Sequence, residues 1–429
     1  GEPGGIEPSP CDFPCLLPGP TECYETLDAT TCQCNAATNT SIANAVALER
    51  HWANVLISCE EGLVEEALCL TRSLLALQAA DLRNASAATA LTSFYLLAGV
   101  EAQQDYLDRG ISELETAIRR LDSLKEEGLP TPDQIDRSVL ATQLVELRDK
   151  NLQLCLLRIQ LNGQLKRQLG CPLDERRFFW PRVEWAPNLA PIDIESAVAE
   201  GLSSRVDLRS LQLVRCKLSK ATVPVARLVL QVADGTLGAV TPTPGLIHHL
   251  RCADCKKHEI DVRCRQLLLL EEDATQLAIA KVKNGAYKVM TQQDRVRLAK
   301  QAVDERRAEL NRLEKIREVE DISIFEISAA RGRLFEAEAT LVEKVIELKV
   351  AEVALRETQG MLAVECGYSV SICGEHCCTG ECGCRPCRTS SACSGSACSR
   401  SACSGSACGC GGASQPGCGL SVCGDAVSD

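Results

Sequence analysis

The sequence predicts an all-α fold built from two copies of a long antiparallel helical hairpin. Three observations support this: a repeated apolar seam, only 3% aromatic residues, and a central region dominated by Glu, Arg, Lys, Ala and Leu. The first seam advances in steps of three and four, with Gln104 as its polar interruption, through Leu97, Val100, Leu107, Ile111, Leu114, Ile118 and Leu121. The second, interrupted by Gln292 and Arg306, runs through Val289, Val296, Ala299, Val303, Leu310 and Leu313. This spacing indicates helices that bury a narrow stripe as coiled coils do, and its duplication predicts a bundle or tube.

Composition excludes several classes of protein. The net charge is −12 and there is no basic stripe, so nucleic acid is not an expected partner. The longest apolar stretches, such as 94–100 and 267–270, are far shorter than the roughly 18 residues of a membrane-spanning helix. We therefore expect no helical membrane anchor.

Cysteine is concentrated at the two ends of the chain. Of 27 cysteines, five lie in the first 40 residues and fourteen lie between Cys366 and Cys423. Such density favours an oxidising compartment or a metal-loaded tail. Four cysteines fall within helical patterns, where we expect thiols that pack as small hydrophobic groups: Cys59, Cys69, Cys155 and Cys216.

The first half begins with a Cys/Pro-rich segment, residues 1–40, whose prolines exclude a continuous helix. The first helical repeat covers 41–171. Its leading helix runs without a strong breaker to about residue 127, a reversal follows at 128–132, and a returning helix runs over 133–169. Gly170 and Pro172 end that helix.

A non-helical crossover, residues 172–191, holds most of the bulky aromatic residues and should pack on the flank of the bundle. The second repeat covers 192–365 and opens with Asp193 as a helix N-cap. It is interrupted by Pro224 and by the Gly/Pro/Thr cluster at 235–245. Helical periodicity returns over 246–318, and a reversal at 319–323 leads into a last helix that ends near 362. Residues 366–429 form a Cys-rich, low-complexity tail that we expect to be disordered or meshed by disulfides.

This order of elements resembles the TolC-type outer-membrane efflux family, over about two thirds of the chain. The second repeat opens with Ile192-Asp193-Ile194-Glu195-Ser196-Ala197-Val198 and Ser204-Arg205-Val206-Asp207-Leu208-Arg209, which is similar to the family's opening motif with Val206 in place of proline. Three further segments look like the family's long helices: Thr92–Gly128, Val282–Ile316 with Tyr287 at the position that matches Tyr95, and Ile324–Leu362.

The resemblance implies a homotrimer whose helices form a hollow tube in the periplasm. The tube would reach the outer membrane and conduct small molecules passively, together with a periplasmic adaptor protein and an inner-membrane pump. Carried over by position, the adaptor-docking tips are Gly128, Leu129, Thr131, Ile322 and Ser323. The second tip departs from the family, because Glu320 stands where a glycine would match.

The family also inserts a strand pair in each half. Only Val223 to Val240 offers room for one, beginning with Val225, Leu228, Leu230 and Val232, and the first half offers nothing comparable between Cys34 and Ala80. We therefore expect little or no β-barrel.

Two clusters are candidates for chemistry. One is a metal site, because a Cys-x2-Cys pair is a common zinc half-site; its ligands would be Cys252, Cys255, His258 and Cys264, near His248 and His249. The alternatives are an ordinary polar helix surface or a disulfide. The other is a pore gate: threefold symmetry would gather acidic residues near the tips, above all Asp133, Glu320 and Asp321, into a ring that selects cations. The alternative is that these are simply solvated helix ends.

No catalytic constellation is present in the sequence. It has no Gly-rich phosphate loop, no Gly-x-Ser-x-Gly elbow and no His-Glu-x-x-His helix, and it contains only five histidines. We expect a protein that is not an enzyme and needs no cofactor. Two functions remain: a TolC-like efflux component, or a structural coiled-coil protein of the cell envelope that is crosslinked through its Cys-rich ends.

Overall fold

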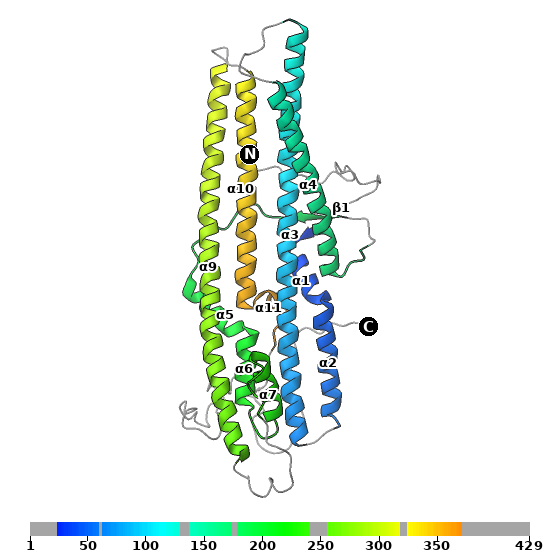
Figure 1. Ribbon diagram of the computed structural model, residues 1–429, viewed down its shortest axis with the longest axis vertical. Coiled ribbons are helices and arrows are strands. Elements are labelled where there is room, and N and C mark those ends of the chain that lie inside the picture. Colours follow the sequence, from blue (N-terminus) through cyan, green and yellow to red (C-terminus); the bar gives the residue numbers. More distant parts are fainter. Residues whose placement is uncertain are drawn as a thin grey trace. The chain divides into compact units, whose positions relative to one another are not determined.

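The computed structural model describes residues 24–59, 62–128, 137–173, 178–240, 255–317 and 324–370. Long helices dominate this part of the chain (Figure 1). In chain order the elements are β1 (Tyr24–Asp28), α1 (Ala29–Asn39), α2 (Ser41–Ile57), α3 (Leu63–Glu126), α4 (Arg137–Leu169), β2 (Phe178–Arg182), α5 (Ile194–Ser204), α6 (Val206–Cys216), α7 (Val223–Ala233), α9 (Cys255–Arg317), α10 (Ile324–Gln359) and α11 (Leu362–Glu365).

The chain divides into two compact units. Unit 1 comprises residues 1–36, 87–192 and 285–355, and unit 2 comprises 37–86, 193–284 and 356–429. The long helices α3 and α9 contribute residues to both units. Among the described residues, no helix has both the length and the hydropathy that crossing a membrane requires.

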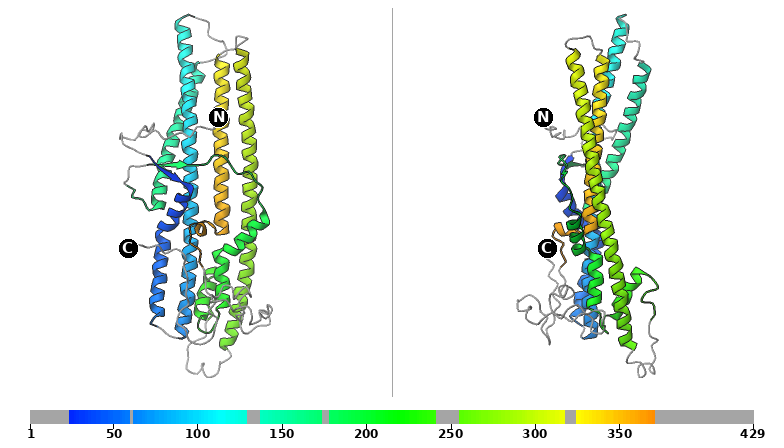
Figure 2. Two further views of the ribbon diagram at one scale, coloured as in Figure 1. Left: turned by 180° about the vertical axis from the view of Figure 1, so that it is seen from behind. Right: turned by 90° about the vertical axis from the view of Figure 1, so that its left-hand side faces the viewer.

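The two predicted hairpins are confirmed in unit 1. Helix α4 runs antiparallel to α3. Three ion pairs join the two helices: Glu101 with Arg158 at 2.9 Å, Glu115 with Arg148 at 2.8 Å, and Asp122 with Arg137 at 2.7 Å. The residue numbers increase along α3 while those of their partners decrease along α4, as antiparallel helices require. Helices α9 and α10 are related in the same way through Arg307 with Glu338 and Arg331 with Glu314, both at 2.9 Å. Both hairpins are visible in Figure 2.

The two apolar seams lie on the buried faces of these helices. Leu97, Val100 and Leu121 are buried on α3, and Val289, Val296 and Val303 are buried on α9. Of the polar interruptions, Gln104 and Gln292 are buried, whereas Arg306 is exposed and pairs with Glu309 at 3.0 Å. The period of the sequence pattern therefore identified the packing face correctly, including two polar positions within it.

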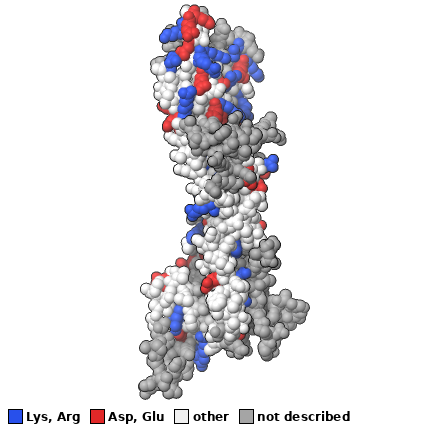
Figure 3. Space-filling model, turned by 90° about the vertical axis from the view of Figure 1, so that its right-hand side faces the viewer, with Lys and Arg blue, Asp and Glu red and all other residues white. Residues whose placement is uncertain are grey.

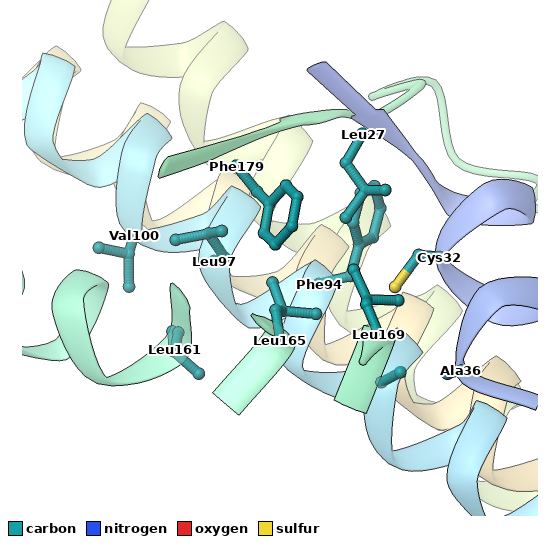
Figure 4. Packing of buried hydrophobic residues seen from close by; sticks show 11 residues of the cluster. Leu27, Cys32, Ala36, Phe94, Leu97, Val100, Leu161, Leu165, Leu169 and Phe179 are labelled. Atoms are coloured by element: carbon teal, nitrogen blue, oxygen red, sulfur yellow. The ribbon is translucent and has the colours of Figure 1, made fainter. Parts of the chain in front are cut away.

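The core of unit 1 is closed by the N-terminal elements and the crossover. One buried cluster joins side chains of β1, α1, α3, α4 and β2 (Figure 4). Most of its members are Leu27 of β1, Cys32 of α1, Phe94 and Leu97 of α3, Leu161, Leu165 and Leu169 of α4, and Phe179 of β2. Strands β1 and β2 are parallel, with Tyr24 opposite Phe178 and Asp28 opposite Arg182. In the described part of the crossover, residues 178–191 contain β2 and no helix, and Phe179 packs against α3 and α4.

The N-terminal boundary was wrong. Residues 24–39 were expected to belong to an irregular segment, yet they form β1 and α1. The prolines that exclude a helix end at Pro20, and Asp28 supplies the cap of α1 by accepting hydrogen bonds from the Thr31 amide at 2.8 Å and its hydroxyl at 2.7 Å.

The prediction of one unbroken leading helix in the first repeat was also wrong, because the chain turns between α2 and α3. Ser58 bonds back to the Val55 carbonyl at 2.6 Å, and Gly62 adopts a φ of +72°, a conformation that glycine tolerates best. Helix α2 then lies antiparallel to α3, where Arg72 donates to the Asn54 side chain at 2.8 Å.

In unit 2, the segment expected to begin a strand is the helix α7. Its residues Val223, Ala226 and Leu230 are buried at helical spacing, and Ala226 and Leu230 pack in one cluster with Leu213 of α6, Leu77 of α3 and Leu267 of α9. Pro224 lies at the start of this helix, where it is tolerated. A short apolar run fits either period, and here tertiary packing selected the helix. At the end of the same segment, where the stub of a second strand was expected, Leu237, Ala239 and Val240 lie in turn and irregular structure.

Candidate functional site

The motif that carried the resemblance joins the start of the second repeat to the end of α10 within unit 2. Asp193 caps α5 by accepting a hydrogen bond from the Glu195 amide at 3.1 Å. Arg205 donates to the carbonyl of Thr358 at 3.0 Å and pairs with Asp207 at 2.5 Å, and Arg209 donates to the carbonyl of Val370. Val206 is the first residue of α6, a position that proline also favours.

The first hairpin tip follows α3. The helix ends at Glu126, and Gly128 adopts a φ of +67°, which turns the chain away from the helix axis. Just before the tip, Arg137 donates to both carboxylate oxygens of Asp122, at 2.7 and 3.1 Å. The other residues predicted here, Leu129, Thr131 and Asp133, lie outside the described residues.

The second tip lies between the end of α9 at Arg317 and the start of α10 at Ile324. The predicted residues Glu320, Asp321, Ile322 and Ser323 lie outside the described residues. Below this tip, α9 and α10 pack through Val303, Leu310, Ile327, Ala330 and Leu334. At the tip end of unit 1, Figure 3 shows acidic and basic side chains interleaved on the surface. The docking and gating residues stay predictions.

A cavity of about 850 Å³ lies in unit 1 between α3, α4 and α10. Its apolar lining includes Leu107 and Leu114 from α3, Leu147 from α4 and Phe335 from α10. Charged residues on opposite walls, such as Glu146 and Glu336, also line it. The cavity is therefore amphipathic and is formed by the two returning helices over α3.

A buried group of polar side chains, which we call the polar junction, links β1, α3 and α4 in unit 1. It consists of Tyr24, Glu101, Gln104, Cys155 and Arg158. Arg158 is only 2% exposed; it lies 2.9 Å from Glu101, donates to Gln104 Oε1 at 2.8 Å and donates to the Tyr24 hydroxyl. Gln104 in turn donates to Cys155 Sγ at 3.0 Å.

Electrostatics distinguish the polar junction from the surface pairs of the same hairpin. Burial raises the pKa of Glu101 to about 7, although the positive charge of Arg158 opposes that rise. The guanidinium also lies over the rings of Tyr24, at 5.3 Å, and Phe178, at 6.0 Å. One charged side chain thus fixes β1 and β2 to α3 and α4.

The polar junction was not predicted from the sequence, although the sequence contains one feature that pointed to it. Gln104 interrupts an otherwise apolar seam, and a buried amide requires partners. Nothing in the linear sequence identified Arg158 as that partner, because it lies 54 residues away along the chain.

The predicted metal ligands are only partly described. Cys252, His248 and His249 lie outside the described residues, and for Cys255 only the backbone is described. On α9, Cys264 is buried whereas His258 is exposed, so these two side chains lie on different faces of the helix. Within the ranges that the structure covers, no three metal-ligating side chains come together. The metal site stays a prediction.

The helical cysteines differ from one another. Cys155 and Cys216 are disulfide-bonded, as are Cys34 and Cys366, so the expectation of buried thiols was wrong for Cys155 and Cys216. It was also wrong for Cys59, which is exposed at the turn after α2. Helical periodicity indicates which face a cysteine occupies but not whether a second cysteine reaches it.

Comparison with known proteins identifies the fold. No family model and no curated protein matches the sequence. Among solved structures, the outer-membrane channel OprN has a TM-score of 0.57 at 13% identity, with 79% of this chain and 92% of that chain covered. The Campylobacter jejuni CmeC outer membrane channel has a TM-score of 0.55 at 9% identity, with 77% and 85% covered.

CusC, a protein described as forming a transmembrane channel, has a TM-score of 0.54 at 11% identity, with 77% of this chain and 91% of that chain covered. Each match extends over most of both chains. At these identities the likeness is one of fold, and the predicted all-α architecture of two hairpin repeats is confirmed. The chain has the helical fold of TolC-type outer-membrane channels.

Proposed function

We propose that this protein is a TolC-like export component, a homotrimer whose long hairpins form a tube in the periplasm and at the outer membrane. The observation that supports this most strongly is the tandem pair of antiparallel hairpins, α3 with α4 and α9 with α10, in a fold shared with outer-membrane channels. The protein would act as a passive conduit for small molecules. It would move them without chemistry of its own and without a cofactor.

In this proposal the hairpin tips dock on a periplasmic adaptor, which connects the tube to an inner-membrane pump. The docking residues are Gly128, Leu129, Thr131, Ile322 and Ser323. The positive φ of Gly128 supports a sharp turn directly after α3. Threefold repetition of Asp133, Glu320 and Asp321 would place a ring of carboxylates around the tube mouth.

Two measurements on the purified full chain test the proposal. Native mass measurement should give a trimer, and insertion into planar bilayers should give discrete conductance steps. A monomer, or a trimer that never conducts, would contradict the export role.

A second function rests on the disulfides. Cys34, Cys155, Cys216 and Cys366 are all disulfide-bonded, which favours an oxidising compartment and suits a crosslinked envelope protein. This alternative, a structural coiled-coil protein crosslinked through its Cys-rich ends, predicts large assemblies that a reductant disperses and that show no conductance. The two measurements above therefore separate the two functions.

A further inference from the structure

Three helices of unit 1 direct one face each toward the cavity of about 850 Å³. The residues that line it recur every three or four positions along α3 over 103–117, along α4 over 140–154 and along α10 over 325–343. Its volume falls in the range of roughly 300–1,000 Å³ that is typical of sites for small molecules. The cavity is therefore large enough to hold a ligand of several rings.

Small side chains on α10 leave this space open. Ser328, Ala329, Gly332 and Ala339 all line the cavity. Gly332 lies within α10, where glycine costs roughly 1 kcal/mol relative to alanine. A Cβ added to Gly332 would meet no neighbouring side chain within 4 Å. A longer side chain at this position would therefore extend into free space.

Aromatic rings line the cavity, although the chain as a whole is only 3% aromatic. Phe325 and Phe335 come from α10 and Tyr106 comes from α3, and all three are partly buried. The guanidinium of Arg109 lies over the Tyr106 ring, 5.6 Å from its centroid, so this ring already takes part in a cation–π contact. The faces of such rings attract organic cations, including quaternary ammonium groups.

Most of the charges at the cavity are already neutralised by partners. The charged residues that line it are Glu113, Glu146, Lys150, Arg333, Glu336 and Glu343. Three of these form ion pairs: Glu113 with Arg331 at 3.6 Å, Arg333 with Glu309 at 2.9 Å, and Glu343 with Lys344 at 2.8 Å.

The other three charges leave the cavity negative. Glu146 and Lys150 on α4 and Glu336 on α10 form no ion pair within the described part of the chain. Two carboxylates therefore stand against one ammonium group, an excess of one negative charge. An apolar space with such an excess attracts ligands of the opposite sign.

We propose that this cavity binds apolar organic monocations, compounds whose single positive charge is surrounded by aromatic or aliphatic groups. The rings of Phe325 and Phe335 and the side chain of Leu147 contact the apolar groups, and Glu146 and Glu336 balance the charge. A bare metal ion does not fit, because no three metal-ligating side chains come together among the described residues. The inference goes beyond the proposed function, since a passive conduit needs no ligand site.

Two ions of the same size and shape but opposite charge test this proposal. Tetraphenylphosphonium is titrated into the purified full chain in a calorimeter, and tetraphenylborate is titrated in the same way. Tetraphenylphosphonium should bind saturably at one site per chain, and tetraphenylborate should bind at least about tenfold more weakly because of the excess negative charge. Equal affinities, or no saturable binding of tetraphenylphosphonium, would overturn the proposal.

A lysine placed in the cavity identifies the site. Gly332→Lys brings a tethered cation into the free space and should weaken the binding of tetraphenylphosphonium at least about tenfold. Gly163→Lys is the matched control, since Gly163 lies on α4, also has open space around it and does not line the cavity. The control should bind as the wild type does. Wild-type affinity in Gly332→Lys would place the ion elsewhere and exclude this cavity.

Removing the two carboxylates tests their role. The double variant Glu146→Gln, Glu336→Gln should bind tetraphenylphosphonium at least about tenfold more weakly and should no longer discriminate against tetraphenylborate. Glu326→Gln, at an exposed position of α10 outside the cavity, should keep the wild-type preference. Circular dichroism confirms that each variant is folded. These titrations require neither conduction nor an adaptor, so the ligand site and the proposed export function can fail independently.

Discussion

Glu101 and Arg158 pose an energetic problem at the scale of single residues. Both are buried in unit 1, where a charge loses its hydration and where opposite charges offset only part of that cost. The hydrogen bonds from Arg158 to Gln104 and Tyr24 provide further compensation. A buried pair of this kind contributes little net stability, but each partner becomes costly once the other is removed.

The raised pKa of Glu101 makes stability depend on pH. Its folded-state pKa of about 7 lies above the ordinary value of 4.5, so the folded protein holds this proton more tightly than the unfolded chain does. The stability from this group is fully present below pH 4.5 and is lost as pH rises through 7. We compare the free energy of unfolding of the wild type with that of Glu101→Gln at each pH. This difference should favour the wild type by about 2 kcal/mol more at pH 5 than at pH 8. Denaturant unfolding of both proteins at the two pH values measures this.

Glu115→Gln is the control for that experiment. Glu115 pairs with Arg148 at 2.8 Å between the same two helices, but both side chains are well exposed. Solvent screening limits such a pair to less than about 1 kcal/mol, so this substitution should change stability slightly at either pH. An equal response of the two variants to pH would contradict the role assigned to Glu101.

Removing the cation of the polar junction should cost more than removing Glu101. Arg158→Met leaves the carboxylate of Glu101 buried without a counter-charge, which typically destabilises by about 3–5 kcal/mol. The loss should be largest at pH 8, where Glu101 is ionised, and smaller at pH 5. Arg148→Met, on the exposed pair of the same helices, should cost less than about 1 kcal/mol. If Arg158→Met and Arg148→Met had equal free energies of unfolding, the distinction between the buried pair and the exposed pair would be refuted.

At the scale of elements, the sequence predicted what depends on long-range periodicity. Helices α3 and α9 were identified because a stripe with a period of three and four persists over many turns, and α4 and α10 were identified as the helices that follow the two reversals. The short elements α1 and α7 were not, because a few residues fit more than one period and packing decides between them. Ala226 and Leu230 are buried at helical spacing only because residues of α3, α6 and α9 pack around them.

The candidate site was predictable to a similar extent. Gly128 and Asp193 were identified from local chemistry, since turns and helix caps depend on neighbouring residues, whereas Arg205 was named because of the resemblance to the family's motif. Arg158 was not identified, because its partners are Tyr24, Glu101 and Gln104, which only the fold brings together.

The turn between α10 and α11 gives a prediction of its own. Gly360 has a φ of +78°, and a Cβ there would lie 3.2 Å from the Ser204 carbonyl oxygen. Gly360→Ala should therefore destabilise the protein by about 1–3 kcal/mol. Gly163→Ala, in the middle of α4 with open space around it, should stabilise by about 0.5–1 kcal/mol, because alanine favours helix. Thermal unfolding of the two variants should shift in opposite directions.

At the scale of the whole molecule, assembly decides what single charges do. In a homotrimer every acidic residue near the tips appears three times, and its effect on a pore depends on whether a cation of the same chain already neutralises it. Asp122 is neutralised in this way, because Arg137 forms a bidentate pair with it. Its carboxylate should therefore contribute little to a ring around the mouth of the tube.

Asp133, Glu320 and Asp321 are the proposed ring, and neutralising them together tests it. In bilayers that separate unequal KCl concentrations, the wild-type channel should show a reversal potential that favours K⁺, since a ring of carboxylates concentrates cations. The variant Asp133→Asn, Glu320→Gln, Asp321→Asn should move that potential toward zero. Asp122→Asn combined with Arg137→Gln removes a neutral pair and should leave the potential near the wild-type value. Equal potentials for wild type and the triple variant would exclude these residues as the gate while leaving the tube in place.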